Sequence, residues 1–273
     1  MTMHADAPFA IGSTHKVCED YARSGETPGG RPYAVVADGC SSSPDTDFGS
    51  RFLPMTAIEC LTLYGMIKPE WVAWRTKDRV SLPLPVRCLD ATLLTLLGND
   101  DEIYASVAGD GVVVAKYRDG KVMVLDVDYK GAPGYLSYLL DQSRFDLYIS
   151  EGYGIRTAKV YVDGVETTVI EDGFKITTPD EFETGMNFSL AECEMVMVCT
   201  DGVHSFVDAD HNPVPMLDVV QHLVSIKSYT GEFLQRRLRR FLTKTCPNLG
   251  WTHGDDLGVA AIYIPEPEEA PDA

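Results

Sequence analysis

Short apolar runs separated by polar and glycine-rich turns dominate the hydropathy pattern of this chain. Runs rich in strand-forming residues predict strands at 8–15, 33–37, 91–97, 102–108, 111–117, 121–127, 194–200 and 257–264. Helices are predicted at 47–66, 135–141, 215–227 and 230–246. Because strands follow one another directly and helices are grouped before and after them, the pattern indicates an α+β fold in which helices cover antiparallel sheets.

The organisation of the chain favours one domain over residues 1–264. No internal repeat, low-complexity linker or long charge run interrupts this part of the sequence. The stretch 130–190 is the hardest to interpret, with hairpins predicted around Gly164 and Gly173. Residues 265–273 are rich in proline and acidic side chains and are predicted to form a disordered tail.

Composition and charge narrow the classes of partner and location. The chain has 273 residues, of which 45% are hydrophobic, so it can bury a substantial core. Its net charge of −18 argues against binding to nucleic acids or anionic membranes, whose phosphates it would repel. The 7 cysteines include no Cys-x-x-Cys pair, and there is no basic leader. No apolar run reaches the ~18 residues that span a bilayer. These features favour a cytoplasmic protein with reduced thiols.

One predicted helix is basic, although the chain as a whole is acidic. The segment 230–246 carries a basic face that consists of Arg236, Arg237, Arg239, Arg240 and Lys244. Such a face could bind an acidic partner surface or could lie solvated on the outside of the protein. The pattern alone favours the solvated face.

Carboxylates stand at the ends of several predicted strands. Asp38-Gly39 follows strand 33–37, Asp201-Gly202 follows strand 194–200, and Asp255-Asp256 precedes strand 257–264. Asp-Gly is also the commonest hairpin dipeptide, so an ordinary turn is the alternative. The flanking runs are wholly apolar, however, and burying an ionised carboxylate costs several kcal/mol unless a partner compensates it. Convergence on a hard divalent cation explains the pattern better.

Further motifs extend this series in a recognisable order. The segments are Glu19-Asp20, Asp38-Gly39, Ala91-Thr92, Gly109-Asp110-Gly111, Asp201-Gly202 and Asp255-Asp256. In order and spacing over nearly the whole chain, they resemble the metal-dependent serine/threonine protein phosphatases of type 2C, in their bacterial-like form. The resemblance implies a four-layer αββα sandwich, with two central antiparallel sheets flanked by helices. It also implies a binuclear Mg²⁺ or Mn²⁺ site at one end.

The resemblance assigns roles to individual residues. Asp38 would bridge the two ions, Asp201 and Asp255 would hold the first ion, and the Gly39 carbonyl would hold the second. An oxygen-only ligand set of this kind selects Mg²⁺ or Mn²⁺ over zinc.

The resemblance gives the neighbouring carboxylates an indirect role. Glu19 and Asp20 would act mainly through metal-bound waters. A water activated by the two ions would attack phosphorus directly, so the reaction needs no nucleophilic side chain, and Asp38 is the main catalytic carboxylate.

Several positions depart from the family pattern. His15 stands where the family usually has an arginine that binds the substrate phosphate, so His15 is the predicted phosphate-binding and catalytic residue. Cys40 stands where the family places His or Met, which leaves no side-chain acid at that position. Ser205 replaces an aspartate of a third, weaker metal site. That site would retain only Asp110, so its occupation is doubtful.

The function predicted from these residues is hydrolysis of phosphoserine and phosphothreonine in proteins. The partner would be a phosphorylated protein substrate, such as one modified by an opposing Ser/Thr kinase. A phosphohydrolase of a small-molecule phosphoester is the first alternative, because position 15 is not arginine and the segment 130–190 is unusual. A catalytically degenerate binding module is the second alternative. The retention of six matched positions argues against it.

Overall fold

Two antiparallel sheets lie face to face in the computed structural model, which describes residues 2–80 and 84–266. The larger sheet has eight strands among the described residues. Its order is β1 (His4–Asp6), β15 (Leu257–Tyr263), β12 (Cys193–Cys199), β7 (Gly111–Tyr117), β8 (Val122–Tyr129), β9 (Ile155–Val162) and β10 (Val165–Lys175), with β2 (Phe9–Ala10) also paired to β15. The smaller sheet has the order β11 (Glu183–Ser189), β6 (Glu102–Ala108), β5 (Leu93–Gly98), β4 (Pro32–Asp38) and β3 (Asp20–Glu26). A separate short pair joins β13 (Phe206–Val207) to β14 (Thr252–His253).

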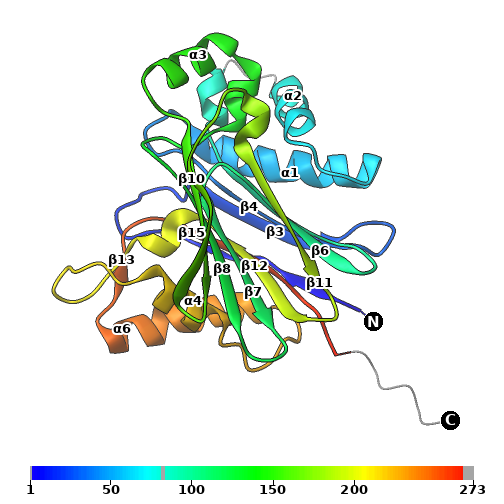
Figure 1. Ribbon diagram of the computed structural model, residues 1–273, viewed down its shortest axis with the longest axis vertical. Coiled ribbons are helices and arrows are strands. Elements are labelled where there is room, and N and C mark those ends of the chain that lie inside the picture. Colours follow the sequence, from blue (N-terminus) through cyan, green and yellow to red (C-terminus); the bar gives the residue numbers. More distant parts are fainter. Residues whose placement is uncertain (1, 81–83, 267–273) are drawn as a thin grey trace.

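Helices cover the outer face of each sheet (Figure 1). Helices α1 (Thr46–Tyr64) and α2 (Pro69–Arg79) lie over the five-stranded sheet. Helix α4 (Met216–Val224) and helix α5 (Phe233–Arg240) lie over the eight-stranded sheet. Helix α5 continues through a π-helical turn, Phe241–Thr245, into α6 (Cys246–Leu249).

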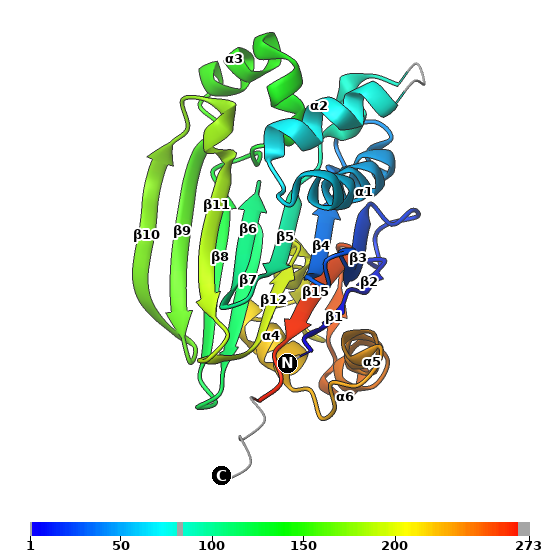
Figure 2. The same cartoon turned by 90° about the vertical axis from the view of Figure 1, so that its right-hand side faces the viewer.

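The segment between β8 and β9 forms a cap at one end of the sheets (Figure 2). It contains a 3₁₀ turn, Leu136–Leu140, and helix α3 (Gln142–Ser150), whose first turn is capped by the Asp141 side chain. Other 3₁₀ turns lie at Val86–Leu89, Pro179–Phe182 and Asp201–His204.

Alternation along the central strands explains the layers. In β4, Ala34 and Val36 point into the core between the sheets, whereas Tyr33 and Val35 pack against the helices outside. In β12, Val196 points inward, and its neighbours on either side face α4 and α5. A strand that is buried on both faces needs apolar residues at every position, which is the continuous pattern that the sequence shows. The predicted four-layer αββα sandwich is therefore confirmed.

Several element boundaries differ from those predicted. The strands at 102–108 and 111–117 lie where the pattern predicts them. Of the strand predicted at 8–15, only the two residues of β2 are in a strand. The hairpin around Gly173 is wrong: Gly173 lies inside β10, at a point where the pairing with β9 shifts register. Strand β3 and helices α2 and α3 were not predicted. The tail prediction falls mainly on 267–273, which lie outside the described residues.

Hydrophobic length gives one further result. No helix within residues 2–80 or 84–266 has both the length and the apolar character that crossing a membrane requires.

Candidate metal and phosphate site

Four aspartates from separate segments converge at one end of the two sheets. Asp20 begins β3 and lies directly opposite Asp38, the last residue of β4. Asp110 precedes β7 and Asp201 follows β12, and these two strands are paired in the other sheet. Adjacent strand ends thus bring together carboxylates that lie far apart in the sequence.

Burial makes this cluster unfavourable for its own negative charge. Burial raises the pKa of Asp20 to about 7, although hydrogen bonding to Asp38 and Thr200 opposes the shift. The pKa of Asp38 is raised well above its usual value by burial and then by the charges of Asp20 and Asp201. Burial, followed by the charge of Asp201, does the same to Asp110. Burial, and then the charge of Asp255, raises the pKa of Asp201. Mutual shifts of this kind mark carboxylates that lie close enough to repel.

The cluster fits a hard divalent cation. Two of its buried oxygens, Oδ1 of Asp20 and Oδ1 of Asp110, have no hydrogen-bond partner in the described part of the chain. Carboxylate oxygens are the preferred ligands of Mg²⁺ and Mn²⁺, and such ions would offset the repulsion. Within residues 2–80 and 84–266, no three His, Cys, Asp or Glu side chains already stand in a coordinating arrangement. The aspartates share one charged neighbourhood without closing into a ready coordination shell.

Hydrogen bonds to two threonines hold two of these aspartates in place. The Thr200 hydroxyl donates to Oδ2 of Asp20 at 2.7 Å. The main chain of Asp38 is fixed by Thr92, whose hydroxyl accepts from Asp38 N at 3.1 Å and whose amide donates to the Asp38 carbonyl at 2.8 Å. The Ala91-Thr92 motif therefore has a structural reason: it fixes the end of β4.

The adjacent aspartates 255 and 256 have different surroundings. Asp255 has a side chain that is 42% exposed, and its charge acts on Asp201. The Asp256 side chain is buried and accepts from the amides of Gly12 at 2.7 Å and Glu19 at 2.6 Å. Asp255 thus remains open to a ligand, whereas Asp256 ties the N-terminal segment to the start of β15.

His15 lies between these two aspartates. Its Nδ1 is 3.0 Å from Oδ2 of Asp256, and its Nε2 is 3.5 Å from Oδ1 of Asp255. The Nδ1 contact lacks hydrogen-bond angles, so we regard it as electrostatic. The contact with Asp256 and the charge of Asp255 raise the pKa of His15, despite partial burial. The two carboxylates therefore favour the cationic form of the imidazole.

Glycines allow close approaches around the cluster. A Cβ on Gly39 would lie 2.8 Å from the Thr46 carbonyl oxygen, so a larger residue would separate β4 from α1. The Gly39 amide donates to the Glu19 carbonyl, and the Glu19 carboxylate accepts from the Thr46 hydroxyl at 3.0 Å. Gly111 has φ 137°, a conformation that side chains rarely adopt, in the turn that carries Asp110.

Comparison with known proteins gives this arrangement a family. Residues 12–243 match the family model for protein phosphatase 2C. The chain belongs to the protein phosphatase 2C family. No curated protein matches the sequence at a significant level.

Solved structures show the same fold at low sequence identity. A bacterial serine phosphatase has a TM-score of 0.61 and 10% identity, and the match covers 98% of this chain and 100% of the other. The serine/threonine phosphatase Stp1 from Staphylococcus aureus has a TM-score of 0.59 and 9% identity, over 97% and 96% of the two chains. The serine/threonine phosphatase of S. agalactiae has a TM-score of 0.57 and 14% identity, over 96% and 100%. At these identities the likeness concerns the fold.

Ser205 is hydrogen-bonded within the turn that follows Asp201. The Ser205 hydroxyl donates to the Gly202 carbonyl at 2.8 Å, which holds it within its own turn. Nearby, Nε2 of His204 lies 3.2 Å from Oδ1 of Asp126. Asp128, on the same strand as Asp126, adds its charge to those acting on Asp110 and Asp201. Asp126 and Asp128 alternate at the end of β8, and this pattern could have placed them near the site from the sequence.

A cavity of about 430 Å³ lies beside the loop that follows Asp38 and Gly39. Cys40 lines it together with Tyr135 and Tyr138 from the cap, and with Arg87 and Arg144. Burial and the neighbouring Cys40 raise the pKa of Tyr135, so its phenol keeps its proton.

Buried Asp90 ties the cap to the rest of this cavity. Both of its oxygens lie 2.9 Å from Nη2 of Arg144, and it accepts from the hydroxyls of Ser43, at 2.6 Å, and Ser137. The sequence pattern did not indicate Asp90, although it directly precedes the Ala91-Thr92 motif, because its partners Ser43 and Arg144 lie 47 and 54 positions away in the chain.

Proposed function

We propose that the protein is a metal-dependent phosphatase that hydrolyses phosphoserine and phosphothreonine in proteins, and so opposes a Ser/Thr kinase. The observation that carries the proposal is the convergence of Asp20, Asp38, Asp110 and Asp201 in a 2C-family fold. Like-charged carboxylates at strand ends destabilise the metal-free protein, and a role in binding cations gives a reason for that cost.

The proposed assignment of the ion ligands follows the sequence. Asp38 would bridge two Mg²⁺ or Mn²⁺ ions, with Asp201 and Asp255 on one ion and the Gly39 carbonyl on the other. Glu19 and Asp20 would act through waters. The exposure of Asp255, compared with the fully engaged Asp256, supports this choice between the neighbours.

When bound, the two cations would activate a water and offset negative charge on the phosphoryl group. The side chains of the protein have the tasks of binding and orientation. Thr92 and Thr200 hold Asp38 and Asp20 at fixed positions. His15, whose cationic form is favoured by Asp256 and Asp255, is the proposed contact for a phosphate oxygen.

The cavity beside Cys40 is the proposed site for the part of the substrate that surrounds the phosphoester. Its tyrosines offer apolar faces to a peptide, and Arg87 has a side chain that is 54% exposed and can meet acidic groups. A bounded cavity of this size also suits a small-molecule phosphoester, which is the alternative substrate class.

A phosphopeptide assay tests the proposal. We expect hydrolysis of phosphothreonine and phosphoserine peptides only with Mn²⁺ or Mg²⁺, and none after exhaustive chelation. Small phosphoesters assayed at the same concentrations separate the two substrate classes. Full activity in excess chelator, or no activity on any phosphoester with excess Mn²⁺, would refute the proposal.

A further inference from the structure

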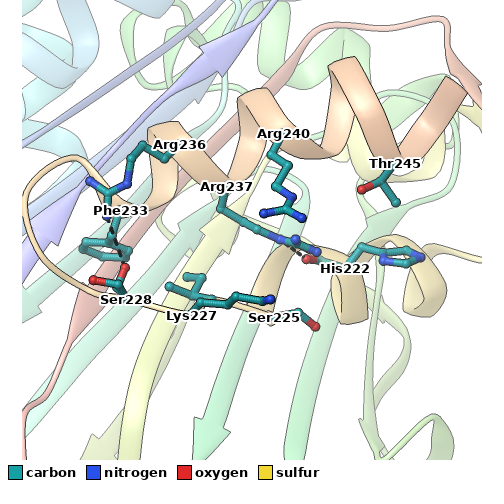
Figure 3. A pocket seen from close by; sticks show the side chains of 10 residues that line it. His222, Ser225, Lys227, Ser228, Phe233, Arg236, Arg237, Arg240 and Thr245 are labelled. Carbon is teal, nitrogen blue, oxygen red and sulfur yellow. Dashed lines mark hydrogen bonds between the residues drawn. The ribbon is translucent and has the colours of Figure 1, made fainter. Parts of the chain in front are cut away.

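A second pocket concentrates positive charge in a chain whose net charge is −18. It lies between α5, with the turn that continues it, and the loop 225–228 that follows α4 (Figure 3). Its volume is about 470 Å³, and Lys227, Arg236, Arg237 and Arg240 line it. None of the residues that line it belongs to the carboxylate site.

These four cations have no carboxylate partner among the described residues. The ion pairs of that part of the chain involve other lysines and arginines. Arg236 donates from Nη2 to the Ser228 carbonyl at 3.3 Å, and Arg237 donates from Nε to the His222 carbonyl. Carbonyl oxygens orient the guanidinium groups but leave their charge uncompensated. Burial, and then the charge of Arg240, lowers the pKa of Arg237.

Only some of the basic residues of this helical segment line the pocket. Arg236, Arg237 and Arg240 line it, whereas Arg239 and Lys244 lie outside it. Arg237 is half-buried, and the other four are exposed. Two backbone amides at the start of α5 are already hydrogen-bonded, because the Asp6 carboxylate accepts from the amide of Leu234 at 2.6 Å and from that of Gln235 at 2.9 Å. The positive character of the pocket therefore comes from its side chains.

The remaining lining indicates the kind of anion. The Thr245 hydroxyl adds a neutral donor, and Ile226 and Phe233 supply an apolar wall. The hydroxyls of Ser225 and Ser228 are already hydrogen-bonded, to the Gln221 carbonyl at 2.6 Å and to the Thr230 hydroxyl at 3.1 Å. Guanidinium groups match phosphate oxygens in pairs. A single phosphate carries about two charges, fewer than the four cations present. A nucleic acid or an anionic membrane would extend past the pocket onto an acidic protein and be repelled.

From these features we propose that the pocket binds a compact organic polyphosphate of the nucleoside diphosphate class. The phosphates would lie among Lys227, Arg237 and Arg240, and the organic part against Ile226 and Phe233. The volume lies within the range of about 300–1,000 Å³ that is usual for small-molecule sites.

Calorimetric titration of the metal-free full chain, in excess chelator, tests this site without phosphatase turnover. The probes are ADP and inorganic pyrophosphate. The test variant is K227Q/R240Q, and the matched control is R239Q/K244Q, which removes the same charge outside the pocket. We expect both probes to bind, with ADP tighter. The test variant should bind both probes at least about tenfold more weakly than wild type, because each of its two substitutions removes a charge-assisted hydrogen bond. The affinity of the control variant should stay within about twofold of wild type.

Three results would overturn the proposal. These are no binding of either probe, equal losses in the two double variants, and binding of pyrophosphate without ADP. Because the protein is metal-free, failure here leaves the phosphatase proposal untouched, and failure of the phosphatase assay leaves this site untouched.

Discussion

The carboxylate site and the basic pocket are opposite in charge and are built in opposite ways. The aspartates come from four segments that are brought together by strand pairing at one end of the two sheets. The cations of the basic pocket come from one helix and the loop just before it, in the outer helical layer. In both places, like charges lie together, and the described residues supply no counter-charge that neutralises all of them.

The difference teaches what each kind of site can do. Strand ends buried between packed layers can fix oxygens closely, as a divalent cation requires. A surface helix and a loop present longer and more mobile side chains, which suit a larger and less exacting anion. Unpaired charge is unfavourable in either place, so a bound ion or ligand of opposite sign should stabilise each region.

The largest expected effect concerns the proposed bridge. Asp38→Asn removes one charge from the centre of the cluster and should lower kcat by at least ~10²-fold, the scale of losing a major electrostatic stabiliser. The metal-free fold should hold or gain stability, because fewer carboxylates repel. Initial rates on a phosphothreonine peptide and urea unfolding of the metal-free variant measure both effects. Near-normal turnover would remove Asp38 from the site.

A neighbouring carboxylate should behave in the opposite way. Asp256 is satisfied by the amides of Gly12 and Glu19, so it is part of the fold and not a free ligand. Asp256→Ala leaves both buried amides without an acceptor and should reduce the free energy of unfolding by about 2–4 kcal/mol. Asp256→Asn, which keeps one acceptor oxygen, should lose about half as much. If the Ala variant unfolds like wild type in urea, these hydrogen bonds do not anchor the N-terminal segment.

The pH dependence should separate the acidic site from the basic pocket. The pKa of Asp20 is raised from 3.8 to about 7 in the folded, metal-free protein, so the folded state holds more protons than the unfolded state in this window. The corresponding stability is present below about pH 4 and is lost as the pH rises through 7. Arginines keep their charge throughout and add no slope.

Unfolding of the metal-free protein from pH 4.5 to 7.5 checks this prediction. Stability of the wild type should fall over the window by more than that of Asp38→Asn, in which a neutral amide relieves the cluster. Parallel profiles for the two proteins would mean that the aspartates do not interact as their burial suggests.

Much of the fold could be predicted from the sequence, because both faces of the central strands are buried. Continuous apolar runs at Val112–Val114 and Leu257–Tyr263 predict buried strands, and the aspartates next to such runs predict the cation site. The order of the carboxylate motifs, through the family resemblance, then indicated the four-layer sandwich. The predicted site residues Asp20, Asp38, Asp110 and Asp201 do lie in one neighbourhood.

The features that sequence reasoning missed depend on contacts across the chain. Asp90 gains its importance from Ser43, Ser137 and Arg144, and no local pattern links these residues. Gly173 looks like a turn residue, yet it lies inside β10, where it permits an irregular register. The division of the basic helix into residues that line the pocket and residues that do not depends on where the 225–228 loop lies.

A Mn²⁺ titration of the metal-free protein tests the central claim most directly. Calorimetry should show two ions bound per chain in the wild type, and unfolding should move to higher temperature as they bind. Asp38→Asn should lose at least one of the two sites, whereas R239Q/K244Q, which changes residues outside the aspartate cluster, should keep both. Absence of binding by the wild type, or the same binding in Asp38→Asn, would contradict the claim that these aspartates form a two-cation site.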